Sequence, residues 1–278
     1  MVPVTTQLSV LQRDKAVSRD DTIRMLLDQS KRRGRAVPIR RAFVQVSTPG
    51  STTPRPGPMR HLLRSPERLE LLLLVHCVTT RADWGTTQRS ETWARAAGIS
   101  FRTDGTASAA VSRHLAQLKK LNLIRTAPDG RMTRITKLHE SGLGLPGLGI
   151  PYTLPSGDEK GSARDIYFKV PFEYWEQGYH RSLSMPAKAM LLIFMSMRRR
   201  SVVLRQDKEF ASWYGISPST VGRGIKELQD KGLLYPYLSE QYLDGRSVLG
   251  QSTRVRWAFA APFDLNININ DREATDAV

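Results

Sequence analysis

One hydrophobic pattern occurs twice along the chain, each time within a segment of helical periodicity. In residues 217–234 the apolar side chains Val221, Ile225 and Leu228 follow one another at spacings of four and three positions. Residues 106–124 repeat these spacings with a valine and two leucines. Residues spaced in this way lie on one face of an α-helix. Each segment is therefore predicted to be an amphipathic helix that packs one face against a core.

These two segments belong to a longer internal repeat. One block aligns residues 106–124, TASAAVSRHLAQLKKLNLI, with residues 217–234, SPSTVGRGIKELQDKGLL. A second block aligns residues 91–100, ETWARAAGIS, with residues 208–217, KEFASWYGIS. The two blocks align at offsets of 110 and 117, because the first copy carries seven additional residues, 101–107, between its two helices. Two copies of one structural module explain this similarity better than chance.

Each copy is predicted to contain a helix, a short helix, a tight turn, a long helix and a hairpin. In the second copy Ser184 is expected to cap a helix that has a proline in its first turn and the apolar run 187–197 behind it. Gly215 is expected to end the short helix, and Ser217 to cap the long one. The turn between these two helices is too short for anything but a helix-turn-helix corner.

A hairpin is predicted after each long helix. In the first copy two strands are expected to flank Pro128-Asp129-Gly130, which is a strong turn sequence. In the second copy a strand over 233–238 precedes a loop around residues 244–246. Apolar residues then alternate with arginines, so we expect a second strand with Arg254 and Arg256 facing outward.

Both halves resemble the winged helix-turn-helix superfamily, over roughly 65–138 and 184–260. The resemblance rests on Gly-Ile-Ser followed, after one proline, by S-T-V-x-R-x-I-x-x-L-x-x-x-G-L-L, which together span residues 215–234. It implies a mainly α fold with small β-hairpins (α+β), made of two winged helix-turn-helix domains that bind DNA with the long helix and the hairpin wing. Two unequal domains of this kind in one basic chain are also similar in architecture to plasmid replication initiators. In that family one domain commonly helps to dimerise and the other binds repeated origin sites.

The charge of the chain favours one class of partner. The 278 residues contain 42 Lys and Arg against 26 Asp and Glu, which gives a net charge of +16. A balance of this size favours nucleic acid or an anionic membrane as a partner. The apolar run 71–78 is far shorter than a membrane span, and the N-terminus has no apolar signal-peptide core. We therefore expect a cytoplasmic, nucleoid-associated protein that does not contact a membrane.

Composition and charge predict five segments along the chain. Residues 1–60 hold twelve Lys and Arg against four Asp and Glu, and they are expected to be a basic, largely flexible arm with a short helix near 21–30. Proline, glycine and serine are frequent in two stretches that resemble linkers, 47–58 and 139–163. The other expected segments are a first winged-helix domain at 61–138, a Gly/Pro linker at 139–163, a second winged-helix domain at 164–262 and an acidic tail at 263–278.

The long helix of the second copy carries small and polar residues opposite its apolar stripe. Ser219, Arg223 and Lys226 on that face are able to approach base edges in a major groove without obstruction. The first copy has alanines at comparable positions, so we expect the second domain to fix the sequence and the first to add affinity. The residues expected to contact DNA are Ser217, Ser219, Thr220, Arg223, Lys226, Arg246 and Arg254 in the second domain, Thr106, Arg113, Lys120, Arg125, Arg131 and Arg134 in the first, and Arg32, Arg33 and Arg35 in the arm.

Nothing in the sequence predicts catalysis or a bound cofactor. The single cysteine, Cys77, excludes a disulfide within the chain and a cysteine-based zinc site. It lies in an apolar run, where a buried and unreactive thiol is expected. No nucleophile, base and oxyanion site can be assembled from the motifs, so we expect that the chain is not an enzyme and binds no metal.

The predicted function is sequence-specific binding of double-stranded DNA. It would serve transcription regulation or the replication initiation of a plasmid or mobile element, with a homodimer on DNA as one arrangement. The sequence leaves two alternatives open, a winged-helix scaffold for protein interaction and the targeting part of a DNA-processing complex. It also leaves open whether the basic arm binds DNA or a protein partner.

Overall fold

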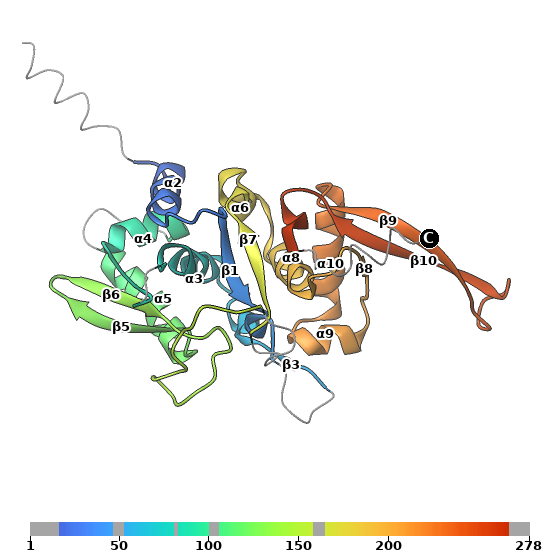
Figure 1. The fold of residues 1–278 in the computed structure, drawn as a ribbon, viewed down its shortest axis with the longest axis horizontal. Coiled ribbons are helices and arrows are strands. Elements are labelled where there is room, and N and C mark those ends of the chain that lie inside the picture. Colours follow the sequence, from blue (N-terminus) through green and yellow to red (C-terminus); the bar gives the residue numbers. More distant parts are fainter. Residues whose placement is uncertain (1–16, 47–52, 81–82, 100–105, 158–164, 267–278) are drawn as a thin grey trace, which may run out of the picture.

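Two helices with long apolar runs lie near the centre of the molecule (Figure 1). They are α3 (Pro66–Val78) and α8 (Met185–Met197). Each is capped by the serine before it, Ser65 or Ser184, whose hydroxyl accepts a hydrogen bond from a backbone N–H of the first turn. The cap predicted at Ser184 is thus confirmed. A helix segment that is apolar on most sides is expected to be buried, and residues 69–78 of α3 and 187–196 of α8 are buried.

The computed structural model describes residues 17–46, 53–80, 83–99, 106–157 and 165–266. Its first module, in chain order, consists of α3, β4 (Gly85–Gln88), α4 (Ser90–Ala97), α5 (Thr106–Lys120), β5 (Ile124–Asp129) and β6 (Met132–Lys137). The three strands form an antiparallel sheet in the order β4-β6-β5. Residues 101–105, most of the insert that distinguishes the first copy, lie outside the described residues.

The second module has the same plan. In chain order it consists of α8, β8 (Val202–Val203), α9 (Lys208–Tyr214), α10 (Pro218–Asp230), β9 (Leu234–Leu243) and β10 (Gln251–Phe259). Its antiparallel sheet has the order β8-β10-β9. The order of elements and the order of strands are the same in both modules, so the sequence repeat is also a structural repeat. The fold is therefore mixed α and β with small antiparallel sheets, as predicted at that level.

A left-handed glycine turns the chain at the corner between the short and the long helix. Gly98 (φ 74°) ends α4, and Gly215 (φ 64°) ends α9. In both modules the isoleucine after the glycine donates its N–H to the carbonyl of the alanine five residues back, at 2.8 Å in the first and 3.2 Å in the second. The Ser217 hydroxyl then caps α10 by accepting from the N–H of Thr220. The prediction of a short helix ended by Gly215 and a long helix capped by Ser217 is confirmed.

The segment before the first module is part of the fold. α2 (Arg19–Gln29) buries its apolar face, and β1 (Ala36–Arg40) pairs along its whole length with β7 (Tyr167–Pro171). The prediction of a largely flexible arm is therefore wrong for residues 17–46. The partner strand of β1 follows the first module in the sequence, and a local pattern of residues does not reveal such a distant pairing.

The stretch that follows the first module is also packed. The buried guanidinium of Arg40, at the end of β1, forms ion pairs with Glu140 at 2.9 Å and with Asp165 at 3.0 Å. Glu140 is itself buried, as is Tyr152. The prediction of a linker is therefore wrong for residues 139–157, and residues 158–164 lie outside the described part of the chain. Arg40 and Glu140 are far apart in the sequence, so their buried ion pair could not be recognised before the fold was known.

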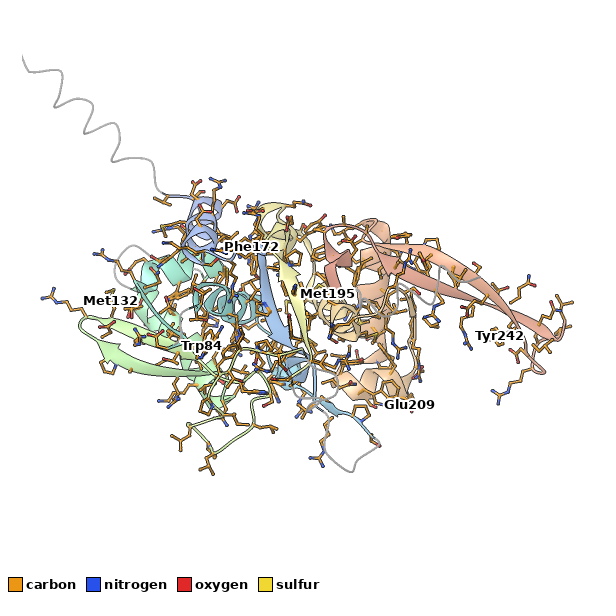
Figure 2. All side chains as sticks on the ribbon, viewed as in Figure 1. Trp84, Met132, Phe172, Met195, Glu209 and Tyr242 are labelled. Atoms are coloured by element: carbon orange, nitrogen blue, oxygen red, sulfur yellow. The ribbon has the colours of Figure 1, made fainter. Side chains whose placement is uncertain are left out.

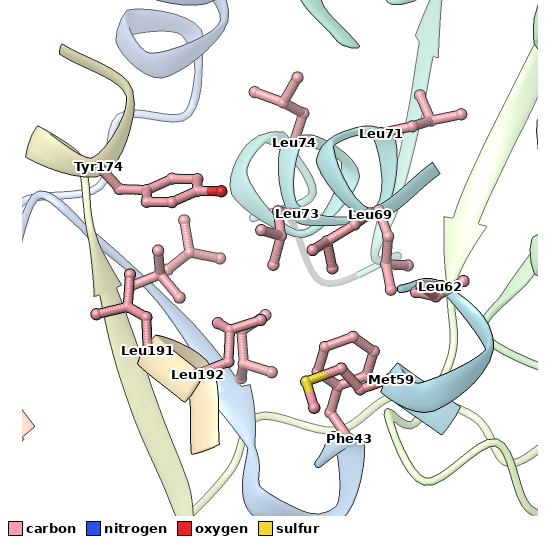
Figure 3. Packing of buried hydrophobic residues seen from close by; sticks show 14 of the residues in the cluster. Phe43, Met59, Leu62, Leu69, Leu71, Leu73, Leu74, Tyr174, Leu191 and Leu192 are labelled. Atoms are coloured by element: carbon pink, nitrogen blue, oxygen red, sulfur yellow. The ribbon is translucent and has the colours of Figure 1, made fainter. Parts of the chain in front are cut away.

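The two modules share one hydrophobic core. Figure 3 shows Leu73 of α3 and Leu192 of α8 within a single cluster of buried side chains, with Tyr174 beside them. Within the same region, Lys188 of α8 forms a buried ion pair with Glu70 of α3 at 2.8 Å. The Tyr174 hydroxyl donates to the same carboxylate at 2.6 Å. A continuous apolar interface fixes the orientation of the modules relative to each other.

Short elements complete the described chain. They are η1 (Arg41–Phe43), β2 (Gln45–Val46), β3 (Arg55–Pro56), η2 (Pro58–His61), α6 (Glu173–Glu176), α7 (Tyr179–Ser182) and η3 (Phe263–Asn266). Phe263 is buried, so the start of the predicted acidic tail belongs to the core, and residues 267–278 lie outside the described residues. Within the described ranges, no helix is both long enough and apolar enough to cross a membrane.

Candidate nucleic-acid interface

α10 packs against α8 through its predicted stripe, and all three residues of that stripe are buried. Gly224 lies where the two helices approach most closely. A Cβ at this position would lie 2.3 Å from the carbonyl oxygen of Pro186 and 2.6 Å from Cγ of Met190. Gly224 was not among the residues predicted to be important, although a glycine within a helical pattern is the usual signal of such a packing contact. The glycine fixes the depth at which α10 lies against the core.

The opposite face of α10 is exposed, and it carries the side chains expected to contact DNA. Ser217, Ser219, Arg223 and Lys226 are all exposed. The Arg223 Nε donates a long hydrogen bond of 3.4 Å to the Ser219 carbonyl, and no ion pair of Arg223 occurs within the described residues. Lys226 pairs with Asp230 at 3.1 Å in open solvent, where such a pair is weak. The Arg223 guanidinium is therefore available to an external acceptor.

Three hydroxyl groups gather at the N-terminus of α10. The Ser217 oxygen lies 2.9 Å from the hydroxyl oxygens of both Ser219 and Thr220, and it accepts from the Thr220 N–H at 3.1 Å. Thr220 is only half-exposed, so its hydroxyl serves the cap, and we place it at the edge of the interface. A helix N-terminus with free donors is a favourable place for a phosphate group.

α5 has the same arrangement of faces but offers fewer donors. Its apolar stripe is buried, while Arg113, Lys120 and two alanines are exposed. Ala110, which aligns with Thr220 in the repeat, is buried. Thr106 begins α5, and its side chain lies outside what the structure describes. The middle of the free face of α5 therefore presents two long donors, Arg113 and Gln117, among small side chains.

The first hairpin, β5–β6, carries one exposed arginine near its root and one in its turn. Arg125 and Arg131 are exposed, and Figure 2 shows Met132 at the outer end of the same hairpin. Arg134 instead forms an ion pair with Asp83, which lies just before β4. Because its guanidinium is already paired, Arg134 is a weaker candidate for DNA contact than Arg125 and Arg131.

The second hairpin, β9–β10, projects from the body of the molecule (Figure 1). Its first strand, β9, extends beyond the strand predicted over 233–238 and ends at Leu243. β8 pairs with β10 at only two residues, so the outer part of the hairpin is a two-stranded ribbon. Arg246 is exposed in the end loop, and the guanidinium of Arg254 lies 4.7 Å from the centre of the Tyr242 ring. Figure 2 shows Tyr242 on the outer part of this hairpin. Arg256, predicted to face outward, donates instead to the Ser201 hydroxyl at 3.0 Å.

Two of the three arginines proposed for the arm have structural contacts. Arg32 donates to the carbonyls of His76 at 2.8 Å and Cys77 at 3.0 Å, at the C-terminal end of α3 where a cation is favoured. Part of its guanidinium is used within the fold, so Arg32 caps α3 and is a weaker candidate for DNA contact than the exposed Arg33. Arg35 pairs with Glu176, which raises the pKa of the Arg35 guanidinium. Arg33 is exposed.

Buried titratable groups lie within the first module. The Lys137 Nζ is 3.9 Å from the ring centre of Tyr152 and 4.9 Å from that of Trp84, and burial lowers the pKa of Lys137 to about 7. Burial also lowers the pKa of His76 well below its usual value and raises the pKa of Cys77 to about 12. The Cys77 thiol is therefore neutral and buried, as predicted.

In the part of the chain that the structure describes, no three His, Cys, Asp or Glu side chains are placed to hold a metal ion.

Comparison of the chain with protein-family models, with curated proteins and with solved structures finds no match. A functional assignment therefore rests on the surface of this molecule. Each module presents a long helix followed directly by a hairpin, and both elements carry exposed arginines.

Proposed function

We propose that this chain is a sequence-specific double-stranded DNA-binding protein with two winged helix-turn-helix domains. It acts in transcription regulation or in the replication initiation of a plasmid or mobile element. The observation that supports this most is the exposed face of α10, where Ser219, Arg223 and Lys226 lie opposite a buried stripe. The net charge of +16 adds long-range attraction to a polyanion.

In this proposal α10 enters the major groove with its exposed face toward the bases. The Arg223 guanidinium has two parallel N–H donors, which match the O6 and N7 acceptors of a guanine, and the Ser219 hydroxyl lies one turn away. The N-terminus of α10, capped by Ser217, contacts a backbone phosphate. One bidentate contact discriminates against a wrong base by about 1–3 kcal/mol. Arg223 is therefore the residue expected to contribute most to sequence preference.

The first domain contributes affinity in this proposal. α5 offers Arg113 and Gln117, with exposed alanines in the positions that carry a hydroxyl and an ammonium group in α10, so it forms fewer hydrogen bonds with base edges, and Arg125 and Arg131 of the hairpin contact phosphates. Because the two modules share one core, the distance between α5 and α10 is fixed. The two parts of the binding site are then separated by a fixed number of base pairs.

Selection of bound sequences from a pool of random duplexes by the full-length protein tests this function. The expected result is one enriched motif with fixed internal spacing, bound at least about a thousandfold more tightly than random duplex. Direct repeats of the motif favour replication initiation, and a single inverted repeat favours a dimeric regulator. A protein that enriches no sequence, or binds no duplex, contradicts the proposal and favours a protein-interaction scaffold.

A further inference from the structure

The end of the β9–β10 hairpin exposes large apolar side chains that the fold does not use. Leu243 is 85% exposed, Val248 102% and Leu249 86%. Single exposed apolar residues are common on protein surfaces, but three within seven positions at one hairpin end form a patch. Because they contact almost nothing in the protein, these side chains add little to its stability. Their position therefore indicates contact with a partner.

The hairpin holds this patch far from the body of the molecule. β9 runs from Leu234 to Leu243, and at about 3.3 Å per residue its length is about 30 Å. A two-stranded ribbon of this kind is only marginally stable by itself. Its root is fixed by β8 and by the Arg256–Ser201 hydrogen bond, whereas its outer part has two free edges. The hairpin is thus built to reach a surface that the rest of the second module does not touch.

Polar groups around the patch favour a partner that is anionic outside and apolar inside. Arg246 lies between the apolar residues and is exposed, and Arg254 is exposed on the adjoining ribbon. The nearby carboxylate of Asp244 is occupied within the loop, where it accepts from the Arg246 N–H at 3.0 Å and from the Ser252 hydroxyl at 2.9 Å. A DNA duplex has this combination, with phosphates outside and stacked bases inside.

We propose that Val248 and Leu249 form a wedge that enters the minor groove, separates two stacked base pairs and kinks the duplex. Apolar side chains inserted between base steps act in this way. Arg246 and Arg254 would hold the hairpin against the flanking phosphates. With a hairpin of about 30 Å and 3.4 Å per base pair, the kinked step lies within about nine base pairs of the bases contacted by α10. This inference rests on the proposed function.

A second copy of this chain fits the patch less well. Two such tips in contact would bring together two exposed Arg246 side chains on chains that each carry a net charge of +16. Like charges at close range disfavour the contact, whereas the same charges attract a duplex. Self-association through the tip is therefore an outcome that the experiment must distinguish.

The experiment uses the full-length protein and the motif obtained by selection, with 2-aminopurine placed at one adenine position per duplex. Wild-type protein is expected to raise 2-aminopurine fluorescence several-fold at one step and to shorten the end-to-end distance measured by energy transfer. The double variant V248S/L249S is expected to lose both signals while keeping its preference for the motif, with affinity lowered about tenfold or less. Leu154→Ser removes an apolar side chain that is 66% exposed elsewhere on the surface, and it should change neither signal.

Several results would overturn the wedge. If wild-type protein binds the motif without unstacking any step, the wedge is refuted and the proposed function stands. The same conclusion follows if V248S/L249S still unstacks the same step. If the double variant instead converts a dimer to a monomer in light scattering, the tip is a self-association surface. If wild-type protein binds no duplex, the proposed function and the wedge fail together.

Discussion

Replacing Gly224 with alanine tests how closely α10 must approach α8. The added Cβ would lie 2.3 Å from the Pro186 carbonyl oxygen, more than 1 Å inside an ordinary van der Waals contact of 3.4 Å or more. The obstacle is backbone and cannot rotate away, so α10 must move. Overpacking of this kind costs about 1–3 kcal/mol, and the better helix propensity of alanine returns about 1 kcal/mol. Taking the upper value, we expect Gly224→Ala to lower the free energy of unfolding by about 2 kcal/mol.

Thermal unfolding followed by circular dichroism measures this effect, with an expected fall in Tm of about 4–8 °C for a chain of this size. Gly222→Ala is the matched control, since it makes the same chemical change in the same helix. Its Cβ would meet only the flexible end of the Gln206 side chain, at 3.2 Å, so its expected effect is neutral or stabilising by up to about 1 kcal/mol. Equal stability of the two variants, or a more stable Gly224→Ala, would refute the packing argument.

Two further predictions concern the buried polar groups. Lys137→Met is expected to be more stable than wild type at pH 7. The Lys137 ammonium has a pKa of about 7 in the folded protein and 10.5 in its ordinary state. At any pH between these two values wild-type Lys137 must therefore lose a proton on folding, which costs free energy. The free energy of unfolding of the wild type therefore rises as the pH increases from 7 to 10.5, and the advantage of the variant shrinks. Urea unfolding of both proteins at several pH values should show this trend. A difference in stability that stays constant with pH would contradict it. Removal of residues 1–46 is expected to unfold the protein, because it deletes β1 and leaves Glu140 buried without Arg40, at a cost of about 3–5 kcal/mol. A truncated protein that keeps a cooperative thermal transition near that of wild type would show that β1 is dispensable.

The repeated part of the fold could be predicted from the sequence because its signals are local. The stripe of α10, the cap at Ser217 and the left-handed Gly215 each depend on residues within a few positions of one another. The resemblance between the two copies supported each of these predictions independently. The short strands β4 and β8 gave no comparable signal, since four and two residues are too few to show alternation.

The joint between the modules could not be predicted, because its partners are distant in the sequence. β1 pairs with β7 across the whole first module, and Arg40 meets Glu140 only once that pairing has formed. In the sequence, Arg40 looked like one of many charges in a basic arm, and Glu140 like a charge in a Gly-rich linker. The candidate site was affected in the same way: Arg32 belongs to a basic cluster, yet in the fold it caps α3.

The most direct test of the central claim compares the binding of Arg223→Ala to the selected motif and to a scrambled duplex. Arg24→Ala is the control, since it removes another exposed arginine, from α2 and outside the proposed interface. We expect Arg223→Ala to weaken binding to the motif by about 5–150-fold, which corresponds to about 1–3 kcal/mol, and to leave binding to the scrambled duplex nearly unchanged. Arg24→Ala should change both affinities little. An equal loss on motif and scrambled duplex would mean that Arg223 contacts only phosphate, and an unchanged affinity for the motif would mean that α10 does not bind the bases.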